Sequence, residues 1–130
     1  MDLGLRGKKV VSQQIEYTVA MYLSDGYLIR FDGPFALLVD NQRVSIAPDV
    51  DPPEHFDPVR QLVGDTIRES LVDDSGALSI SFDTGARIEC VPDEQFESWT
   101  LAGPRGFKVV SMPGGDLAVW DEADPDELRE

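Results

Sequence analysis

Residues 96–120, FESWTLAGPRGFKVVSMPGGDLAVW, carry the clearest indication of the fold of this chain. It contains three short apolar runs, Trp99 to Ala102, Phe107 to Val110 and Leu117 to Trp120, which are separated by Gly-Pro-Arg-Gly and Pro-Gly-Gly-Asp. Runs of β-branched and aromatic residues bounded by such sequences are typical of antiparallel strands. Because proline presets a turn and glycine allows positive φ, the stretch predicts a three-stranded antiparallel meander.

The first half of the chain shows the same kind of pattern. Apolar and polar residues alternate over Ile15 to Leu23, which predicts one half-buried strand. Asp25-Gly26 then predicts a tight hairpin turn into a strand over Tyr27 to Phe31. A second hairpin is predicted from Phe35 to Val39 and from Arg43 to Ile46.

A different composition separates the two halves. Residues 47–57, APDVDPPEHFD, contain prolines and acids without any periodicity, so they predict a long crossing loop. Asp57 as the N-cap, Pro58 at the first helical position and Gly64 as the stop predict a short helix near 58–63.

The second half repeats features of the first. Strands are predicted over Thr66 to Val72, Leu78 to Phe82 and Ala86 to Val91. Apolar and glycine positions of the first half recur in the second half at a constant difference in residue number. This difference increases by two residues at the longer turn Asp73 to Gly76. The matches are Leu5, Gly7 and Val10 with Leu62, Gly64 and Ile67, and Val19, Met21, Leu23, Gly26 and Ile29 with Leu78, Ile80, Phe82, Gly85 and Ile88. We interpret them as an internal duplication.

These patterns predict a mainly β fold in which two pseudo-repeated antiparallel β-meander units form one barrel-like or sandwich core. The units are residues 5–46 and 65–120, joined by the connector 47–64, within a single β-rich domain 1–120. A domain of this length can bury roughly two thirds of its unfolded surface. Residues 121–130 form an acidic tail that we expect to be disordered or to make one frayed helical turn.

The charge balance limits the kinds of partner. The chain has 25 Asp and Glu against 11 Lys and Arg, a net charge of −14, which repels nucleic acids and anionic membranes and attracts basic proteins. Cys90 is the single cysteine, so no intrachain disulfide can form, and a cytoplasmic location is expected. The N-terminus lacks the long apolar run of a signal peptide or a membrane span.

Residues able to carry chemistry are few. His55, the single histidine, lies among four acids, but prolines stand where a calcium loop needs ligands, so we expect no metal site. Cys90 shares a predicted strand face with Ile88 and is expected to be a buried hydrophobe. The chain contains neither a G-x-S-x-G elbow nor a Gly-rich phosphate loop. We therefore predict a protein that is not an enzyme and needs no cofactor.

One cluster suggests a binding surface. The acids Asp93, Glu94 and Glu97 surround the aromatic residues Phe96 and Trp99. Aromatic anchors within a polar rim dominate many protein interfaces, so these five residues are candidates for binding a basic partner. The alternative is that both aromatic rings cover the core while the acids face water.

The order of residues also resembles a known family. The pattern comprises Gly64-x-x-Ile67, Leu78-x-Ile80-x-Phe82-x-x-Gly85, Phe96-x-x-Trp99-x-Leu101-x-Gly103-Pro104-x-Gly106 and Pro113-Gly114-Gly115-x-Leu117-Ala118-Val119-Trp120. It resembles small uncharacterised actinobacterial proteins with a C-terminal WxLxGPxG…PGGxLAVW motif, a domain of unknown function. The resemblance implies a compact β-rich domain and no known catalytic residues. In size and charge alone the chain is also similar to immunity proteins of bacterial toxin systems.

Three functions remain open at this point. The first is a non-enzymatic protein-interaction domain, such as an immunity or inhibitor protein that binds a basic toxin. The second is a small-molecule-binding β-barrel or small enzyme with a pocket between the two units, lined by Tyr17, Tyr27 or Trp99. The third is a structural subunit that dimerises through an edge strand.

Overall fold

The structure, a computed structural model, describes residues 1–121, so the expectation for the acidic tail lies outside the described residues except at Asp121. Within this range it contains eleven strands and one short α-helix. In chain order they are β1 Val10–Ile15, β2 Val19–Leu23, β3 Leu28–Phe31, β4 Phe35–Val39, β5 Gln42–Ile46, α1 Asp57–Arg60, β6 Ile67–Val72, β7 Leu78–Phe82, β8 Arg87–Cys90, β9 Trp99–Ala102, β10 Lys108–Ser111 and β11 Leu117–Trp120.

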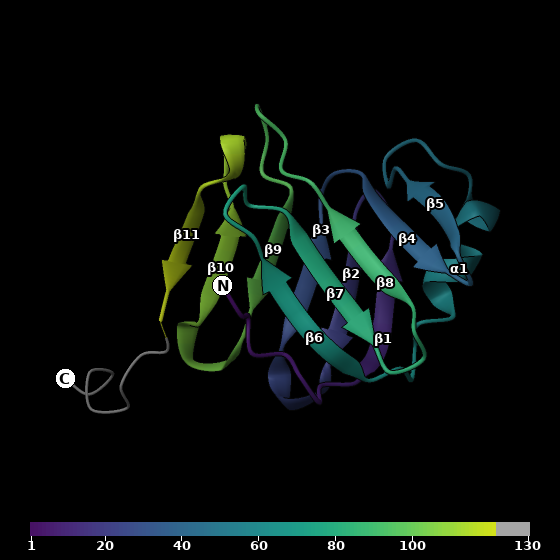
Figure 1. Cartoon of the computed structure of the whole chain (residues 1–130), viewed down its shortest axis with the longest axis horizontal. Helices are drawn as coiled ribbons and strands as arrows, with labels where there is room; N and C mark the ends of the chain where they lie inside the picture. Colours follow the sequence, from purple (N-terminus) through teal and green to yellow (C-terminus); the bar gives the residue numbers. More distant parts are fainter. Residues whose placement is uncertain (122–130) are drawn as a thin grey trace.

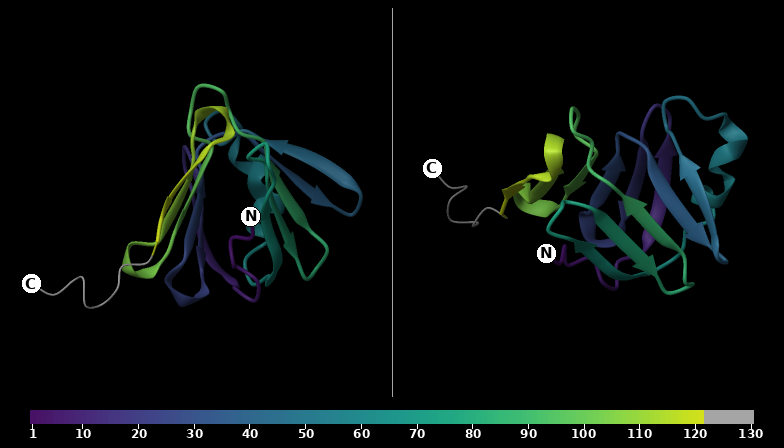
Figure 2. Two further views of the ribbon diagram at one scale, coloured as in Figure 1. Left: turned by 60° about the vertical axis from the view of Figure 1, so that its left-hand side comes forward. Right: turned by 45° about the horizontal axis from the view of Figure 1, so that its top comes forward.

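The strands form two antiparallel sheets that face each other as a sandwich (Figure 1). The six-stranded sheet has the order β1-β2-β3-β9-β10-β11, and the five-stranded sheet has the order β5-β4-β8-β7-β6. The left view of Figure 2 shows the sheets as two layers. The predicted mainly β fold is therefore confirmed, as a sandwich and not as a closed barrel.

The C-terminal meander is present as predicted. β10 pairs with β9 through Val110 opposite Thr100, and with β11 through Val110 opposite Ala118. The two connections are short 3₁₀ turns in which Arg105 and Gly114 adopt positive φ. The Gly-Pro turn sequences thus set both the number and the spacing of these strands.

The prediction of one strand over Ile15 to Leu23 is wrong. The alternating segment is broken by a turn in which the Glu16 N–H donates to the Thr18 carbonyl oxygen, and β1 and β2 pair on either side of it. Tyr17, at the tip of this turn, is 80% exposed. The polar and apolar alternation continues through the turn, so periodicity alone could not reveal it.

The connector between the halves is anchored by apolar side chains. A 3₁₀ turn over Pro53–Phe56 leads directly into α1, which is shorter than the helix predicted near 58–63. Phe56, Val59 and Leu62 are all buried in the core. The connector therefore closes one end of the sandwich as well as joining the halves.

The two halves exchange strands. β4 does not stay beside β3 but pairs with β8, with Leu37 opposite Ile88, while β9 pairs with β3, with Leu101 opposite Ile29. Where the sheets meet, the Val10 N–H donates to the Asp65 carbonyl and the Ile67 N–H donates to the Lys8 carbonyl, at 2.9 and 2.8 Å. The two hydrogen bonds are equivalent, because the sequence matches pair Val10 with Ile67 and Lys8 with Asp65.

The N-terminal segment covers the outer edge of β6. The Leu3 N–H donates to the Ser70 carbonyl at 2.9 Å, and the Leu5 N–H donates to Ser70 Oγ at 3.1 Å. The side chains of Leu3 and Leu5 are buried. An edge that would otherwise be open to pairing is thereby closed within the chain.

The core between the sheets is filled with large side chains, of which Trp99, Phe31 and Phe82 are the largest fully buried ones. Three buried side-chain polar atoms, Gln13 Oε1, Trp99 Nε1 and Ser111 Oγ, have no hydrogen-bond partner among the described residues. Within residues 1–121 every helix is too short or too polar to cross a lipid bilayer.

Candidate functional site

The predicted binding residues lie on a loop between β8 and β9, which we call the 93–97 loop. In Figure 1 it projects beyond both sheets at the top of the molecule. Asp93 Oδ1 accepts hydrogen bonds from the N–H groups of Gln95 and Phe96, at 2.7 and 3.1 Å. The Asp93 N–H donates to Ser98 Oγ at 2.8 Å, and the Gly114 N–H donates to the Asp93 carbonyl at 2.9 Å. The loop is thus fixed by its own first residue and by the β10–β11 turn.

The side chains on this loop differ in accessibility. Phe96 is 68% exposed, and Glu94 and Glu97 are exposed beside it. Trp99 is fully buried in the core, so it is not available to a partner. The structure therefore brings the predicted acids and Phe96 together on one surface and separates Trp99 from them.

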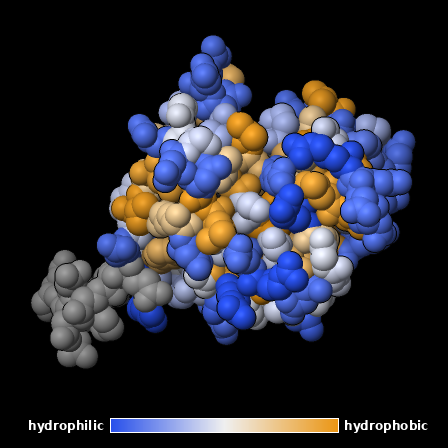
Figure 3. Space-filling model, in the orientation of Figure 1, coloured by the Kyte–Doolittle hydropathy of each residue, from blue (hydrophilic) through white to orange (hydrophobic). Residues whose placement is uncertain are grey.

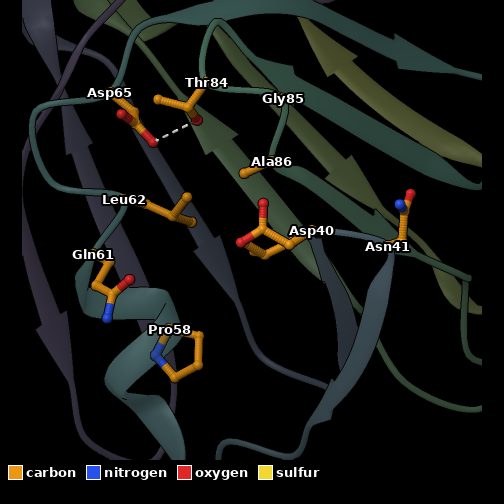
Figure 4. A pocket seen from close by; sticks show the side chains of 10 residues that line it. Asp40, Asn41, Pro58, Gln61, Leu62, Asp65, Thr84, Gly85 and Ala86 are labelled. Carbon is orange, nitrogen blue, oxygen red and sulfur yellow. Dashed lines mark hydrogen bonds between the residues drawn. The ribbon is translucent and has the colours of Figure 1, made fainter.

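A cleft of about 560 Å³ opens at the end of the five-stranded sheet (Figure 4). Its walls come from the β4–β5 turn, from α1 with the residues that follow it, and from the β7–β8 turn. Val39, Leu62 and Ala86 contribute apolar surface, and Asp40 and Asp65 contribute carboxylates. The volume lies within the usual range for small-molecule pockets.

The carboxylates of this cleft are only partly compensated. Thr84 Oγ1 donates a hydrogen bond to Asp65 Oδ2 at 3.0 Å, drawn as the dashed line in Figure 4. In residues 1–121 neither Asp40 nor Asp65 forms an ion pair with Lys, Arg or His. The cleft therefore favours a cationic group over an anionic one.

His55 fixes the connector to the edge of the five-stranded sheet. Its Nε2 lies 2.8 Å from the Ser45 carbonyl and 3.5 Å from Asp51 Oδ2. Asp51 Oδ2 also accepts a hydrogen bond from the Ala47 N–H at 2.7 Å. Among the described residues no group of three or more His, Cys, Asp or Glu is placed to hold a metal ion. The contacts of His55 with Ser45 and Asp51 hold the connector against β5.

Cys90 lies in β8 with its side chain in the core. Its Sγ is 3.7 Å from the Pro34 carbonyl oxygen. Burial raises the pKa of the thiol to about 12, because the thiolate would lose its hydration. The thiol is therefore neutral at physiological pH and is a poor nucleophile.

The three aromatic residues considered for a pocket between the units lie in different environments. Tyr17 extends from the β1–β2 turn, Trp99 fills the core, and Tyr27 packs edge to face against Phe107. None of the three lines the cleft of Figure 4. The cleft of Figure 4 was missed by the sequence analysis, although the match of Tyr27 with Ala86 marks the place where a large side chain is absent.

Comparison with models of known protein families identifies the family of this chain. The model of a family described as "Family of unknown function (DUF6188)" matches residues 1–121. Searches of curated proteins and of solved structures found no significant match. Since the family model covers nearly the whole chain and all eleven strands, the chain belongs to DUF6188, a family of unknown function.

Proposed function

We propose that this protein is a non-enzymatic protein-interaction domain that binds a basic partner through the 93–97 loop, and that its role is inhibitory, as in an immunity protein that neutralises a toxin. The observation that carries this proposal is Phe96. An aromatic ring that is 68% exposed, on a loop held by four hydrogen bonds, is presented to the outside with little conformational entropy left to lose on binding.

The charges around Phe96 suit a basic partner. Glu94 and Glu97 are exposed on the same loop as Phe96, and the whole chain carries a net charge of −14. An aromatic anchor within a charged rim gives affinity from the ring, while the rim and the overall field give speed of association and salt dependence. The Asp93 carboxylate fixes the backbone of this loop, because it accepts hydrogen bonds from the N–H groups of Gln95 and Phe96.

Two further features belong to the same proposal. We infer that the WxLxGPxG…PGGxLAVW motif marks the family, because its Gly and Pro residues build the turns of the C-terminal meander. The single cysteine supports a cytoplasmic location, and the resemblance of the motif supports an actinobacterial origin. We also infer an internal duplication, which the pairwise correspondence of the Val10 to Asp65 and Ile67 to Lys8 hydrogen bonds supports.

The test measures binding of the wild-type chain and of Phe96→Ala to the products of the adjacent genes, at low and at high salt. We expect one basic product to bind, with affinity that falls as salt rises, and we expect Phe96→Ala to weaken binding at least about 10-fold. Tyr17→Ala is the matched control, since it removes an aromatic ring that is even more exposed than Phe96 from the β1–β2 turn. Equal binding by wild type and Phe96→Ala would refute the proposed surface.

A second candidate function is dimerisation through the edge strand β11. Val119 and Trp120 in this strand are 45% and 51% exposed, and β11 has no strand on its outer side in the described sheet. Figure 3 shows hydrophobic residues on the left, where Figure 1 draws β10 and β11. The net charge of −14 on each copy opposes self-association. A mass measurement in solution at several salt concentrations distinguishes the two, because salt would favour the dimer and weaken the basic complex.

A further inference from the structure

The two halves differ at one pair of corresponding positions, which hold an aromatic side chain in the first half and border a cleft in the second. In the first half, the place beside the β2–β3 turn is filled by the Tyr27 ring, which packs against Phe107 with ring centroids 6.2 Å apart. The ammonium group of Lys8 lies 4.9 Å from the centroid of Tyr27 and 2.7 Å from Asp25 Oδ2. The hydrogen bond to Asp25 raises the pKa of Lys8, so the group over the ring is a cation. An aromatic ring capped by an ammonium group thus occupies this place.

In the second half, both parts of that arrangement are missing. The sequence matches pair Tyr27 with Ala86, Lys8 with Asp65, and Asp25 with Thr84. The backbone supports this pairing, since the Leu23 N–H donates to the Tyr27 carbonyl and the Phe82 N–H donates to the Ala86 carbonyl. A methyl group replaces the ring and a carboxylate replaces the ammonium. The cleft of about 560 Å³ lies at this place, as Figure 4 shows around Ala86 and Asp65.

We propose that this cleft binds an arylalkylammonium group, an aromatic ring joined by a short chain to a protonated amine. The ring lies against the apolar surface of Leu62, Val39 and Ala86, and the ammonium group lies beside the carboxylates of Asp65 and Asp40. The ligand supplies the two groups that the first half carries within its own chain. It can be a free amine or the side chains of a peptide, and its binding does not depend on the 93–97 loop.

One difference between the halves shapes the cleft. Gly103 lies against the Tyr27 ring, and a Cβ at that position would come within 2.7 Å of Tyr27 Cε1. The residue in the corresponding place beside Ala86 is Val39, which comes from the first half because β4 pairs with β8 as β9 pairs with β3. A ring bound in the cleft therefore packs beside the Val39 side chain, whereas the Tyr27 ring uses the space that Gly103 leaves free. A variant that refills the cleft must allow for this valine.

The first experiment titrates the full chain with tyramine and follows the backbone amide signals by NMR. We expect saturable shifts centred on Gly85, Asn41 and Gln61, which line the cleft. The anion 3-(4-hydroxyphenyl)propionate tests the need for the cation, and n-butylamine tests the need for the ring; both should bind at least about 5-fold more weakly. Asp65→Asn should weaken tyramine by a similar factor, and Phe96→Ala should leave it unchanged, which separates this proposal from the proposed function.

The second experiment fills the cleft. Ala86→Tyr restores the ring of the first half, and Val39→Gly with Ala86→Tyr also restores the space that Gly103 gives it. Each variant should keep a dispersed amide spectrum and lose the tyramine shifts. A blocked dipeptide, acetyl-Lys-Tyr-amide, tests the peptide source, and the tighter of the two ligands identifies the source. The proposal is wrong if neither ligand binds at the cleft, if the anion binds as tightly as tyramine, or if binding survives in a folded filled variant.

Discussion

Two buried serines provide a matched test of how polar groups stabilise this sandwich. Ser70 and Ser111 are both fully buried. Ser70 Oγ accepts the hydrogen bond of the Leu5 N–H at 3.1 Å, and Leu5 is also fully buried. Ser111 Oγ has no partner among the described residues. Substitution by alanine therefore has opposite consequences at the two positions.

For Ser70→Ala, the Leu5 N–H stays buried and loses its acceptor. An unsatisfied buried donor costs about 1–3 kcal/mol, so we expect the free energy of unfolding to fall by about 2 kcal/mol. In a domain of this size each kcal/mol changes Tm by roughly 4 °C, which gives a fall of roughly 8 °C. For Ser111→Ala, the lost hydroxyl has no hydrogen-bond partner within residues 1–121, so we expect the free energy of unfolding to stay the same or to rise by up to about 1 kcal/mol.

Urea unfolding followed by tryptophan fluorescence measures both variants. With an m value near 2 kcal/mol/M, Ser70→Ala should lower the urea midpoint by about 1 M and leave m unchanged. Ser111→Ala should keep or slightly raise the midpoint. If Ser111→Ala destabilises the protein as much as Ser70→Ala does, the hydroxyl of Ser111 has an essential partner and the reasoning fails.

Two further predictions concern the interior and the loops. Burial raises the pKa of the Cys90 thiol to about 12, so in the folded protein this thiol should resist a disulfide reagent at mildly alkaline pH. In concentrated guanidinium chloride, where the chain is unfolded, the thiol should react at once. Rapid labelling of the folded protein would contradict this prediction. Gly115→Ala should lower the free energy of unfolding by at least about 2 kcal/mol, because the φ of Gly115 is +102° and an added Cβ would clash with the Ser75 carbonyl. Gly33→Ala is the control, since there is open space around Gly33, and it should change the free energy of unfolding by less than about 1 kcal/mol. Equal effects of the two substitutions in thermal unfolding would contradict the contact between Gly115 and Ser75.

The hairpins and the C-terminal meander could be predicted because their turns are chemically defined. Asp25 and Gly26 both adopt positive φ, and Asp-Gly is among the sequences that allow this most easily. The turn at Tyr17 contains neither glycine nor proline, and so the prediction ran through it. Local sequence determines where a strand turns only where a residue restricts or frees the backbone.

The partners of the strands could not be predicted in the same way. Leu37 opposite Ile88 and Ile29 opposite Leu101 join residues far apart in the chain, and an apolar row does not state which other row it will pair with.

The candidate sites show the same limit. Trp99 and Leu101 share the inward face of β9, so period two could have assigned Trp99 to the core and left Phe96 as the exposed ring. The cleft depends on a side chain that is absent, Ala86 where the first half has Tyr27, and only a comparison of the halves reveals it.

The exchange of strands has a consequence for synthesis on the ribosome. β1, β2 and β3 emerge early but lack their fourth neighbour until β9 has been made, and β4 waits for β8 in the same way. Neither sheet can close while only the first half of the chain has left the exit tunnel. The nascent protein must therefore keep its apolar rows from aggregating until residue 102 has left the exit tunnel, and the acidity of the chain helps it to do so.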